Sequence, residues 1–322
     1  MEFLDQTYDI KIWTIADGKL GRFVALDTET TMVPFYMTPD LVTIQAYSGG
    51  TDVYYVRITD LEAFLDVHDD CFWILQNAPF DMDVLAKELS SRKRIFALYD
   101  NCRVRDTAVL YRLSHLASVG YVPFKRNLAM LSGKYLGHEL VKDETRENFG
   151  QFLSLPVEDI PQNYLEYGAI DVIATYKIYF ALIAEIRQHD KQNTLLSHDI
   201  QAKGDLALLH MHKNGIGFDL ARRDEWLVEV DVQMQKHRDI LASWGWVRGR
   251  KGINDVFANI IDRLGLTDKL PRTGGDKGIK GGRVSSKAED LAPYRGNGFV
   301  DSYLEYQKLE KASGFVRDIT TN

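Results

Sequence analysis

The sequence has little cysteine and no long apolar segment. Only two cysteines occur in 322 residues, Cys71 and Cys102, which is too few for a disulfide framework and typical of a reducing compartment. The longest apolar runs, such as IYFALIA at residues 178–184, fall far short of the roughly 20 residues that span a bilayer. The N-terminus lacks the apolar stretch of a signal peptide. We therefore expect a cytoplasmic protein without a membrane partner.

Negative charge prevails, but it is unevenly distributed. The formal net charge is −7, yet residues 245–322 carry 14 Lys and Arg against 10 Asp and Glu. Within them, KLPRTGGDKGIKGGRVSSK at residues 269–287 holds six cations and one acid among glycines and serines. Such a segment is typical of a loop that follows a phosphate backbone, and also of a solvated loop with no partner. Charge alone leaves both interpretations open.

The order of predicted elements indicates an α/β region followed by a helical one. Strand patterns alternate with helical patterns in the first half, which is typical of helices packed on a sheet. From residue 161 onward apolar residues recur at helical spacing. The predicted strands are 22–30, 41–48, 52–58 and 71–77, and the predicted helices are 61–69, 81–89, 106–113, 161–190, 195–214, 220–245 and 299–316. The length is sufficient for two domains, each with its own core.

The first predicted strand ends with two carboxylates, Asp27 and Glu29. Because side chains alternate along a strand, these two project to one side and Thr28 to the other. Two carboxylates at the edge of a core are costly through desolvation and repulsion, and a cationic partner, a shared proton or a divalent metal relieves that cost. The nearest cation in the sequence is Arg22. Taken alone, the pair also fits a strand that simply ends at the surface.

Two further polar pairs follow along the chain. Asn77 precedes Asp81 by four residues where a strand gives way to a helix, and Tyr167 precedes Asp171 by four on one helical face. Each residue has an ordinary structural interpretation. Asn77 could be an N-cap, Asp81 a first-turn acid and Tyr167 a half-buried aromatic residue. These pairs indicate a function only when they are considered together with Asp27 and Glu29.

The order LDTET, NxxxD and YxxxD resembles the three exonuclease motifs of the DEDD superfamily, in its tyrosine-containing branch. The resemblance is closest to the 3′–5′ proofreading domain of family A DNA polymerases and covers residues from about 20 to 190. It implies a ribonuclease H-like fold, with a mixed sheet flanked by helices, in agreement with the α/β pattern. The segment VRDTAVLYRL resembles a polymerase segment that follows the second motif, and we expect its Asp106 to be structural.

The resemblance also implies the catalytic residues. Phosphodiester hydrolysis requires an activated water and neutralised charge, which two Mg²⁺ ions about 4 Å apart supply together. Carboxylates are the hard ligands that Mg²⁺ prefers, and Mn²⁺ is an alternative. By motif, Asp27, Glu29 and Asp171 hold the first ion, Asp27 bridges to the second, and Asp81 supports the second through water. Tyr167 orients the attacking water.

The downstream sequence resembles the thumb of the same polymerases. LHMHKNGIGFD resembles the turn that leads into the thumb, and GRVSSKAEDLAPY followed by FVDSYLEYQKLEKASGFV resembles the segment that runs along the duplex. We therefore predict an exonuclease domain at residues 1–190 and a mainly helical, thumb-like region with the basic loop at residues 191–322. A generic helical subdomain is the alternative.

The implied substrate is a single-stranded or frayed DNA 3′ end. Residues near the acids would contact its terminal nucleotide, and the cations of the basic loop would hold the backbone without reading sequence. The predicted contact residues are Leu26, Asn77, Phe80, Lys277, Lys280, Arg283 and Lys287.

Motifs of the polymerase active site do not occur before Asn322. The palm carboxylate in an Asp-Tyr-Ser-like motif and the paired Arg and Lys of the fingers helix are both missing, so we do not expect this chain to polymerise nucleotides. We expect either a fragment of a longer polymerase or a split form that works with a separate palm-and-fingers chain.

Two other functions remain open. An RNA 3′-processing exonuclease of the ribonuclease D type shares the four carboxylates and the tyrosine, but it would carry a compact helical nucleic-acid-binding domain that we do not recognise in residues 195–322. A noncatalytic DNA-binding or docking subunit of a split polymerase is the second. The intact set of acids argues against it, since a decayed exonuclease domain would be expected to lose at least one.

Overall fold

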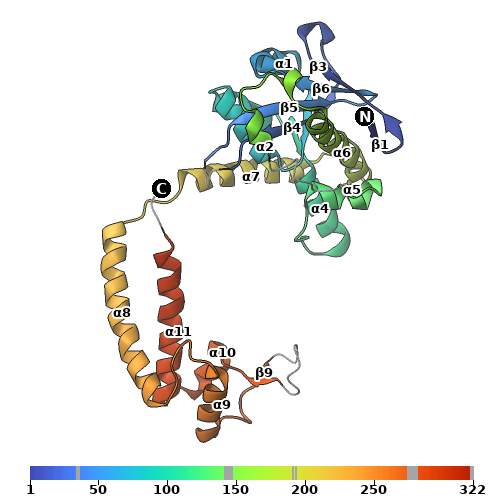
Figure 1. Ribbon diagram of the computed structural model, residues 1–322. Helices are drawn as coiled ribbons and strands as arrows, with labels where there is room; N and C mark the ends of the chain where they lie inside the picture. The colour runs from blue at the N-terminus through green and yellow to red at the C-terminus, as the bar shows by residue number, and fades with distance from the viewer. Residues whose placement is uncertain (34–36, 141–147, 191, 193, 274–281, 320–322) are drawn as a thin grey trace. The chain divides into compact units, whose positions relative to one another are not determined.

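The protein consists of two compact units, Met1–Gly215 and Ile216–Asn322 (Figure 1). The computed structural model describes residues 1–33, 37–140, 148–190, 192, 194–273 and 282–319. None of the helices in these ranges has the length and apolar character needed to cross a membrane.

The first unit is built on a six-stranded mixed sheet, with strand order β3-β6-β5-β4-β7-β8. The central strand β4 runs antiparallel to β5 and parallel to β7. Strand β6 is antiparallel to β5 and parallel to β3, and β8 is parallel to β7. The strands of this sheet are β3 (Asp9–Ile12), β4 (Phe23–Thr30), β5 (Leu41–Tyr47), β6 (Asp52–Val56), β7 (Phe72–Leu75) and β8 (Val104–Asp106), and a separate short pair comprises β1 (Glu2–Phe3) and β2 (Gln6–Thr7).

Helices cover both faces of this sheet, as the predicted α/β pattern requires. The helices of the first unit are α1 (Leu61–Val67), α2 (Ala78–Glu88), α3 (Arg92–Asp100), α4 (Thr107–Val119), α5 (Leu128–Leu136), α6 (Gln162–Ile186) and α7 (Leu196–Asn214). Alternation along β4 separates two cores. Ala25 faces the core beneath α6, α4 and α5, whereas Val24 and Leu26 face the core beneath α1, α2 and α3. The predicted ribonuclease H-like, mixed-sheet fold is confirmed.

The predicted strands and helices are all present, with small shifts at their ends. Helix α2 begins three residues before the predicted residue 81, because Pro79 occupies its first turn, where a missing N–H costs nothing. In the first unit the sequence patterns missed the strands β1, β2, β3 and β8 and the helices α3 and α5, and in the second unit they missed the helix at Ile253–Arg263 and the short elements at residues 272–273, 283–284 and 288–291. The missed strands of the first unit have two to four residues each, which give too little alternation to recognise.

Helix α7 places the boundary between the units later than the predicted residue 190. It packs against β8, α4, α2 and α3, and its Ala202 and Leu206 are buried in the core beneath α2. The boundary lies at Gly215, whose φ of +64 degrees suits a residue without a side chain at the end of a helix.

A buried polar network attaches α7 to the end of β8. Nε2 of His198 accepts a hydrogen bond from the backbone N–H of Asp106 at 2.9 Å, so the ring proton is on Nδ1. Nδ1 donates to Asp199, which also pairs with the buried Arg105 at 2.6 Å. Burial acts to raise the pKa of Asp199, but the bond from His198 and the charge of Arg105 together hold that pKa below its usual value. Helix α7 therefore belongs to the first unit.

Asp106 itself is structural, as the sequence predicts. Its buried carboxyl accepts from the backbone N–H groups of Ala108 and Val109, at the start of α4. It also accepts from those of Asn77 and Ala78, at the start of α2, the latter at 2.8 Å. One carboxyl thus caps two helices. Burial raises the pKa of Asp106, while the backbone donors oppose that rise.

The second unit is mainly helical, as the sequence predicts. It comprises α8 (Leu220–Ser243), α9 (Ile253–Arg263), β9 (Arg272–Thr273), β10 (Arg283–Val284), α10 (Ala288–Leu291) and α11 (Gly298–Arg317). Helices α8 and α11 lie side by side (Figure 1). They are antiparallel, because Arg317 near the end of α11 pairs with Asp231 in α8, and Arg248 beyond α8 pairs with Glu310. Trp246, Phe257, Phe299 and Tyr303 form the aromatic centre of its core.

Removing the double cap should destabilise the first unit more than removing a single cap. We expect Asp106→Ala to lower the free energy of unfolding by about 2–4 kcal/mol, since each lost N-cap costs about 1–2 kcal/mol. Asn127→Ala is the matched control, because Asn127 gives α5 one cap bond, to Met130. Urea unfolding followed by far-UV circular dichroism measures both. Equal losses for the two variants would contradict the double cap.

Candidate active site

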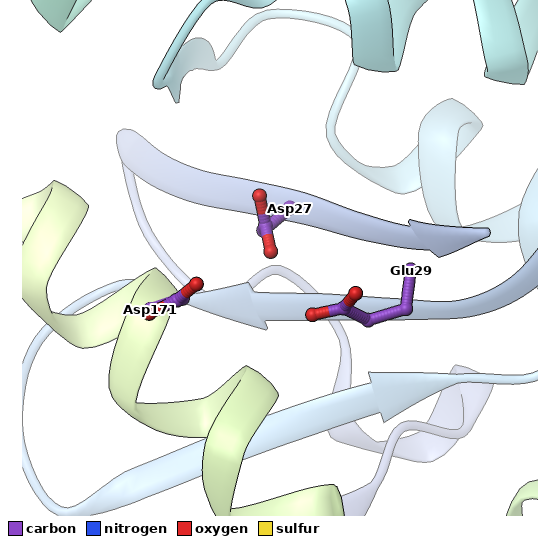
Figure 2. Close-up of side chains that lie close together, drawn as sticks. All are labelled: Asp27, Glu29 and Asp171. Carbon is purple, nitrogen blue, oxygen red and sulfur yellow. The ribbon is translucent and has the colours of Figure 1, made fainter. Parts of the chain in front are cut away.

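Three carboxylates meet on one face of the central strand. Asp27 and Glu29 come from β4 and Asp171 comes from α6, which packs on that face. Each offers one carboxylate oxygen, and these oxygens all lie within 4.8 Å of one another. Figure 2 shows the three side chains directed toward a common space. All three residues are half-buried. The strand alternation that the sequence predicts therefore brings the two β4 acids together with the helical one.

The pairing of β4 with β5 changes at this point. Asp27 lies opposite Gln45 and Glu29 lies opposite Thr43, but Thr30 pairs with Leu41, so the register shifts between Glu29 and Thr30. A shift of this kind bends a strand and redirects the neighbouring side chains. The shift lies next to the two acids of β4, so it affects the direction in which their carboxylates point.

Asp81 lies near this group but is not part of it. Its Oδ1 accepts hydrogen bonds from Thr28, from the backbone N–H at 3.1 Å and from the hydroxyl at 2.7 Å. Thr28 projects from β4 on the side opposite to Asp27 and Glu29, so Asp81 approaches the strand from the α2 side. Burial raises the pKa of Asp81 to about 7, against the opposing effect of the Thr28 bonds.

One cavity of about 1380 Å³ is lined by all the predicted catalytic residues, which are Asp27, Glu29, Asp81, Tyr167 and Asp171. Asn77 and Phe80, from the start of α2, line the same cavity. Asn77 occupies the N-cap position with a φ of +64 degrees, yet its side chain makes no cap bond there. The cap is supplied by Asp106, so the Asn77 amide is available to the cavity.

Tyr167 lies one turn before Asp171 on α6. Its ring is half-buried and packs against Phe149, with ring centroids 6.1 Å apart. Because residues four apart share a helical face, Tyr167 and Asp171 present a phenol and a carboxylate to the same space. This agrees with the predicted pairing of the two residues.

The prediction for Leu26 is wrong. Leu26 is fully buried in the core between the sheet and α2 and does not line the cavity, because β4 alternates and its neighbour Asp27 faces the other way. A contact between its side chain and a nucleotide would require the sheet to open.

The predicted backbone contacts belong to the second unit. Arg283 lies in β10, and Lys287 precedes α10 with an exposed side chain that pairs with Glu289 at 3.4 Å. Lys277 and Lys280 lie outside the described residues.

The sequence patterns missed one wall of the cavity, which residues 122–127 form. They belong to the 121–127 connection between α4 and α5. His115 bonds to the carbonyl of Tyr121 at 2.9 Å, and Gln76 donates to the carbonyl of Arg126 at 2.8 Å. Between these anchors Phe124 is 96% exposed, and the exposed Lys125 follows it. An aromatic residue followed by two cations, FKR, is the signal that could have revealed this wall.

The carboxylate group suits a divalent cation. Three acids with oxygens this close would repel one another strongly if all were ionised without a counter-charge. Oxygen ligands of this type are those that Mg²⁺ and Mn²⁺ prefer. The donor set of Asp27, Glu29 and Asp171 therefore fits the predicted metal, and Tyr167 lines the same cavity.

A mixed sheet of this order, with acids from its central strand and from the helix packed on it, defines a nuclease of ribonuclease H-like fold. Residues 8–187, more than half of the chain, match the model of the 3′–5′ exonuclease family of family A DNA polymerases. The chain belongs to this family, and the predicted 3′–5′ exonuclease domain is confirmed. The family implies a divalent metal at the site. No curated protein matches the chain significantly.

One solved structure, a DNA polymerase domain, shows the same fold. The POL domain of Pol1 from M. smegmatis, in a complex with DNA primer-template and dNTP, is 18% identical, with a TM-score of 0.66, 95% of this chain covered and 49% of that chain. The protein thus spans about half the length of that polymerase structure. The Aedes aegypti Nibbler EXO domain is 18% identical, with a TM-score of 0.45, and the match covers 56% of this chain and 90% of that one. Brucella melitensis NrnC is 17% identical, with a TM-score of 0.43, and the match covers 65% of this chain and 91% of that one.

A divalent cation should stabilise the first unit through these acids. With Mn²⁺ at about 100 times its dissociation constant, we expect a gain of about 2.7 kcal/mol in the free energy of unfolding. Asp171→Asn should abolish most of that gain, because it removes a charged ligand. Urea unfolding with Mn²⁺ and with EDTA measures the difference. Asp66→Asn, which changes an exposed acid on α1, should keep the full gain. An unchanged gain in Asp171→Asn would exclude this metal site.

Proposed function

We propose that this protein removes nucleotides one at a time from the 3′ ends of DNA by metal-dependent hydrolysis. The observation that carries the proposal is the convergence of Asp27, Glu29 and Asp171 beside Tyr167 on the wall of a large cavity. DNA as the substrate rests on the family of the domain and on the thumb-like second unit. The polymerase activity that such a domain would serve would need a palm and fingers, from further sequence or from a separate chain.

Each residue has a role in this proposal. Asp27, Glu29 and Asp171 hold the metal, and Asp81 supports a second ion of the same kind. A bound divalent cation stabilises charge on the phosphate and lowers the pKa of water. The Tyr167 hydroxyl holds and orients the attacking water by a hydrogen bond, which does not require the phenol to ionise.

The start of α2 and the 121–127 connection hold the DNA strand in this proposal. Asn77 offers amide hydrogen bonds and Phe80 an apolar surface to the terminal nucleotide. Phe124 offers a ring on which a preceding base can stack, and the cations after it offer charge to the phosphates. These contacts do not depend on base identity, as removal of any mispaired 3′ nucleotide requires.

Loss of a metal ligand should affect hydrolysis more than loss of the phenol. We expect Asp27→Ala to abolish turnover, and Tyr167→Phe to slow it by about 10²–10⁴-fold or less, the range of a single general acid–base group. Asp66→Ala is the control for an acid outside the cavity. Near-normal turnover by purified Asp27→Ala would contradict the metal assignment.

The substrate is tested with a 5′-labelled single-stranded DNA and the matching RNA, each with Mg²⁺ or with EDTA, resolved at single-nucleotide spacing. The proposal expects a Mg²⁺-dependent ladder that shortens from the 3′ end on DNA. A preference for RNA would favour the ribonuclease D type of enzyme. Binding of DNA without a ladder would indicate a noncatalytic subunit.

Truncation of Phe124 should weaken strand binding without affecting the chemical step. Stacking of one base is worth about 1–3 kcal/mol, so we expect Phe124→Ala to raise KM about tenfold and to leave kcat nearly unchanged. Ile15→Ala is the control, because Ile15 is also exposed and apolar but lies outside the cavity. The measurement is steady-state hydrolysis of single-stranded DNA. A lower kcat at unchanged KM would contradict a role in strand binding.

A further inference from the structure

Strand β5 places two buried polar side chains beneath the acids. Gln45 lies directly opposite Asp27 and Thr43 directly opposite Glu29. Gln45 is fully buried, and its carboxamide makes no hydrogen bond of good geometry to any described residue, although it lies beside the Tyr55 hydroxyl. Burial without a partner is costly for a carboxamide, and a hydrocarbon side chain of the same size would avoid that cost. Gln45 therefore needs an explanation beyond filling the core.

Helix α6 rests directly on this carboxamide at Gly168. A Cβ added at Gly168 would lie 2.2 Å from Nε2 of Gln45 and 2.7 Å from the hydroxyl of Tyr55. Neither separation is possible for real atoms, and both neighbours are fully buried, so they have little room to move. Gly168 follows Tyr167 and precedes Asp171 by three residues. The contact thus lies between the two functional residues of the helix.

Tyr55, on the neighbouring strand β6, also contacts this part of α6. It lies opposite Gln45 on β6, and its hydroxyl donates to the carbonyl of Leu165 at 2.6 Å. Burial raises the pKa of Tyr55, and the charges of Glu29, Asp27 and Asp171 raise it further, while the Gln45 side chain beside its hydroxyl opposes that rise. Asp27, Gln45 and Tyr55 thus form a row across three adjacent strands, with α6 lying over it.

We propose that Gln45 is a positioning residue for the metal site, because its buried carboxamide sets how closely α6 approaches the sheet and hence where Asp171 lies relative to Asp27. The proposal rests on the proposed function. Asp27 and Glu29 are fixed by their own strand, but Asp171 reaches them only if the helix lies at the right height. A change in that height moves one ligand of three and alters metal affinity before it alters DNA binding.

Two substitutions test the contact from its two sides. Gln45→Met keeps the length of the side chain and removes the carboxamide, and Gly168→Ala pushes the helix away from an unchanged Gln45. Gly133→Ala is the matched control, since Gly133 lies in α5 with no atom within 4 Å of an added Cβ. The first measurement is Mn²⁺ affinity by calorimetry without DNA. The second is kcat and KM for single-stranded DNA.

We expect both variants to bind Mn²⁺ at least about tenfold more weakly, as for other partners of metal ligands. Both should lose kcat while KM for DNA stays unchanged, and Gly133→Ala should match the wild type. Because the two residues touch, the double variant should lose less than the product of the two single losses. A merely structural role of Gln45 would lower the thermal midpoint and leave Mn²⁺ affinity intact.

Wild-type Mn²⁺ affinity in folded Gln45→Met would overturn the proposal. If that variant does not fold, Gln45→Asn retains the amide but withdraws it by one methylene, and wild-type Mn²⁺ affinity in Gln45→Asn would overturn the proposal equally. Failure of the proposed function gives a different result, since the wild type itself would then not shorten DNA.

Discussion

The site depends on the close approach of α6 to the central strands of the sheet. Two ligands come from β4 and one from α6, so the three carboxylates meet only because the helix lies against the sheet at Gly168. Bringing three like charges together opposes folding, and burial of the apolar surface of α6 contributes the favourable free energy that offsets this cost. A site built in this way gains affinity for a cation from the same repulsion that weakens the unit without one.

The opposite wall of the cavity depends on a different carboxyl. Asp106 satisfies the first N–H groups of α2 and of α4, so one buried group orients both helices. Helix α2 carries Asn77, Phe80 and Asp81 to the cavity, and α4 leads into the 121–127 connection. The geometry of this wall thus comes from a residue that does not itself line the cavity.

Much of the fold and most of the acids were predictable, because they follow from local rules. Alternation along residues 22–30 predicted which side chains of β4 share a face, and helical spacing joined Tyr167 to Asp171. The same alternation should have excluded Leu26 from the cavity, but the motif resemblance outweighed it. The roles of Gln45 and of α7 were not predictable, because they depend on contacts between residues far apart in the sequence, which periodicity does not encode.

The attachment of α7 determines how much of the chain is needed for a self-sufficient first unit. A recombinant fragment that stopped at residue 190 would leave the Arg105 charge without Asp199 and the Asp106 N–H without His198, both in buried positions. It would also expose the apolar surface that Ala202 and Leu206 cover. Such a fragment would tend to aggregate during expression, whereas one that ended at Gly215 would retain every one of these partners.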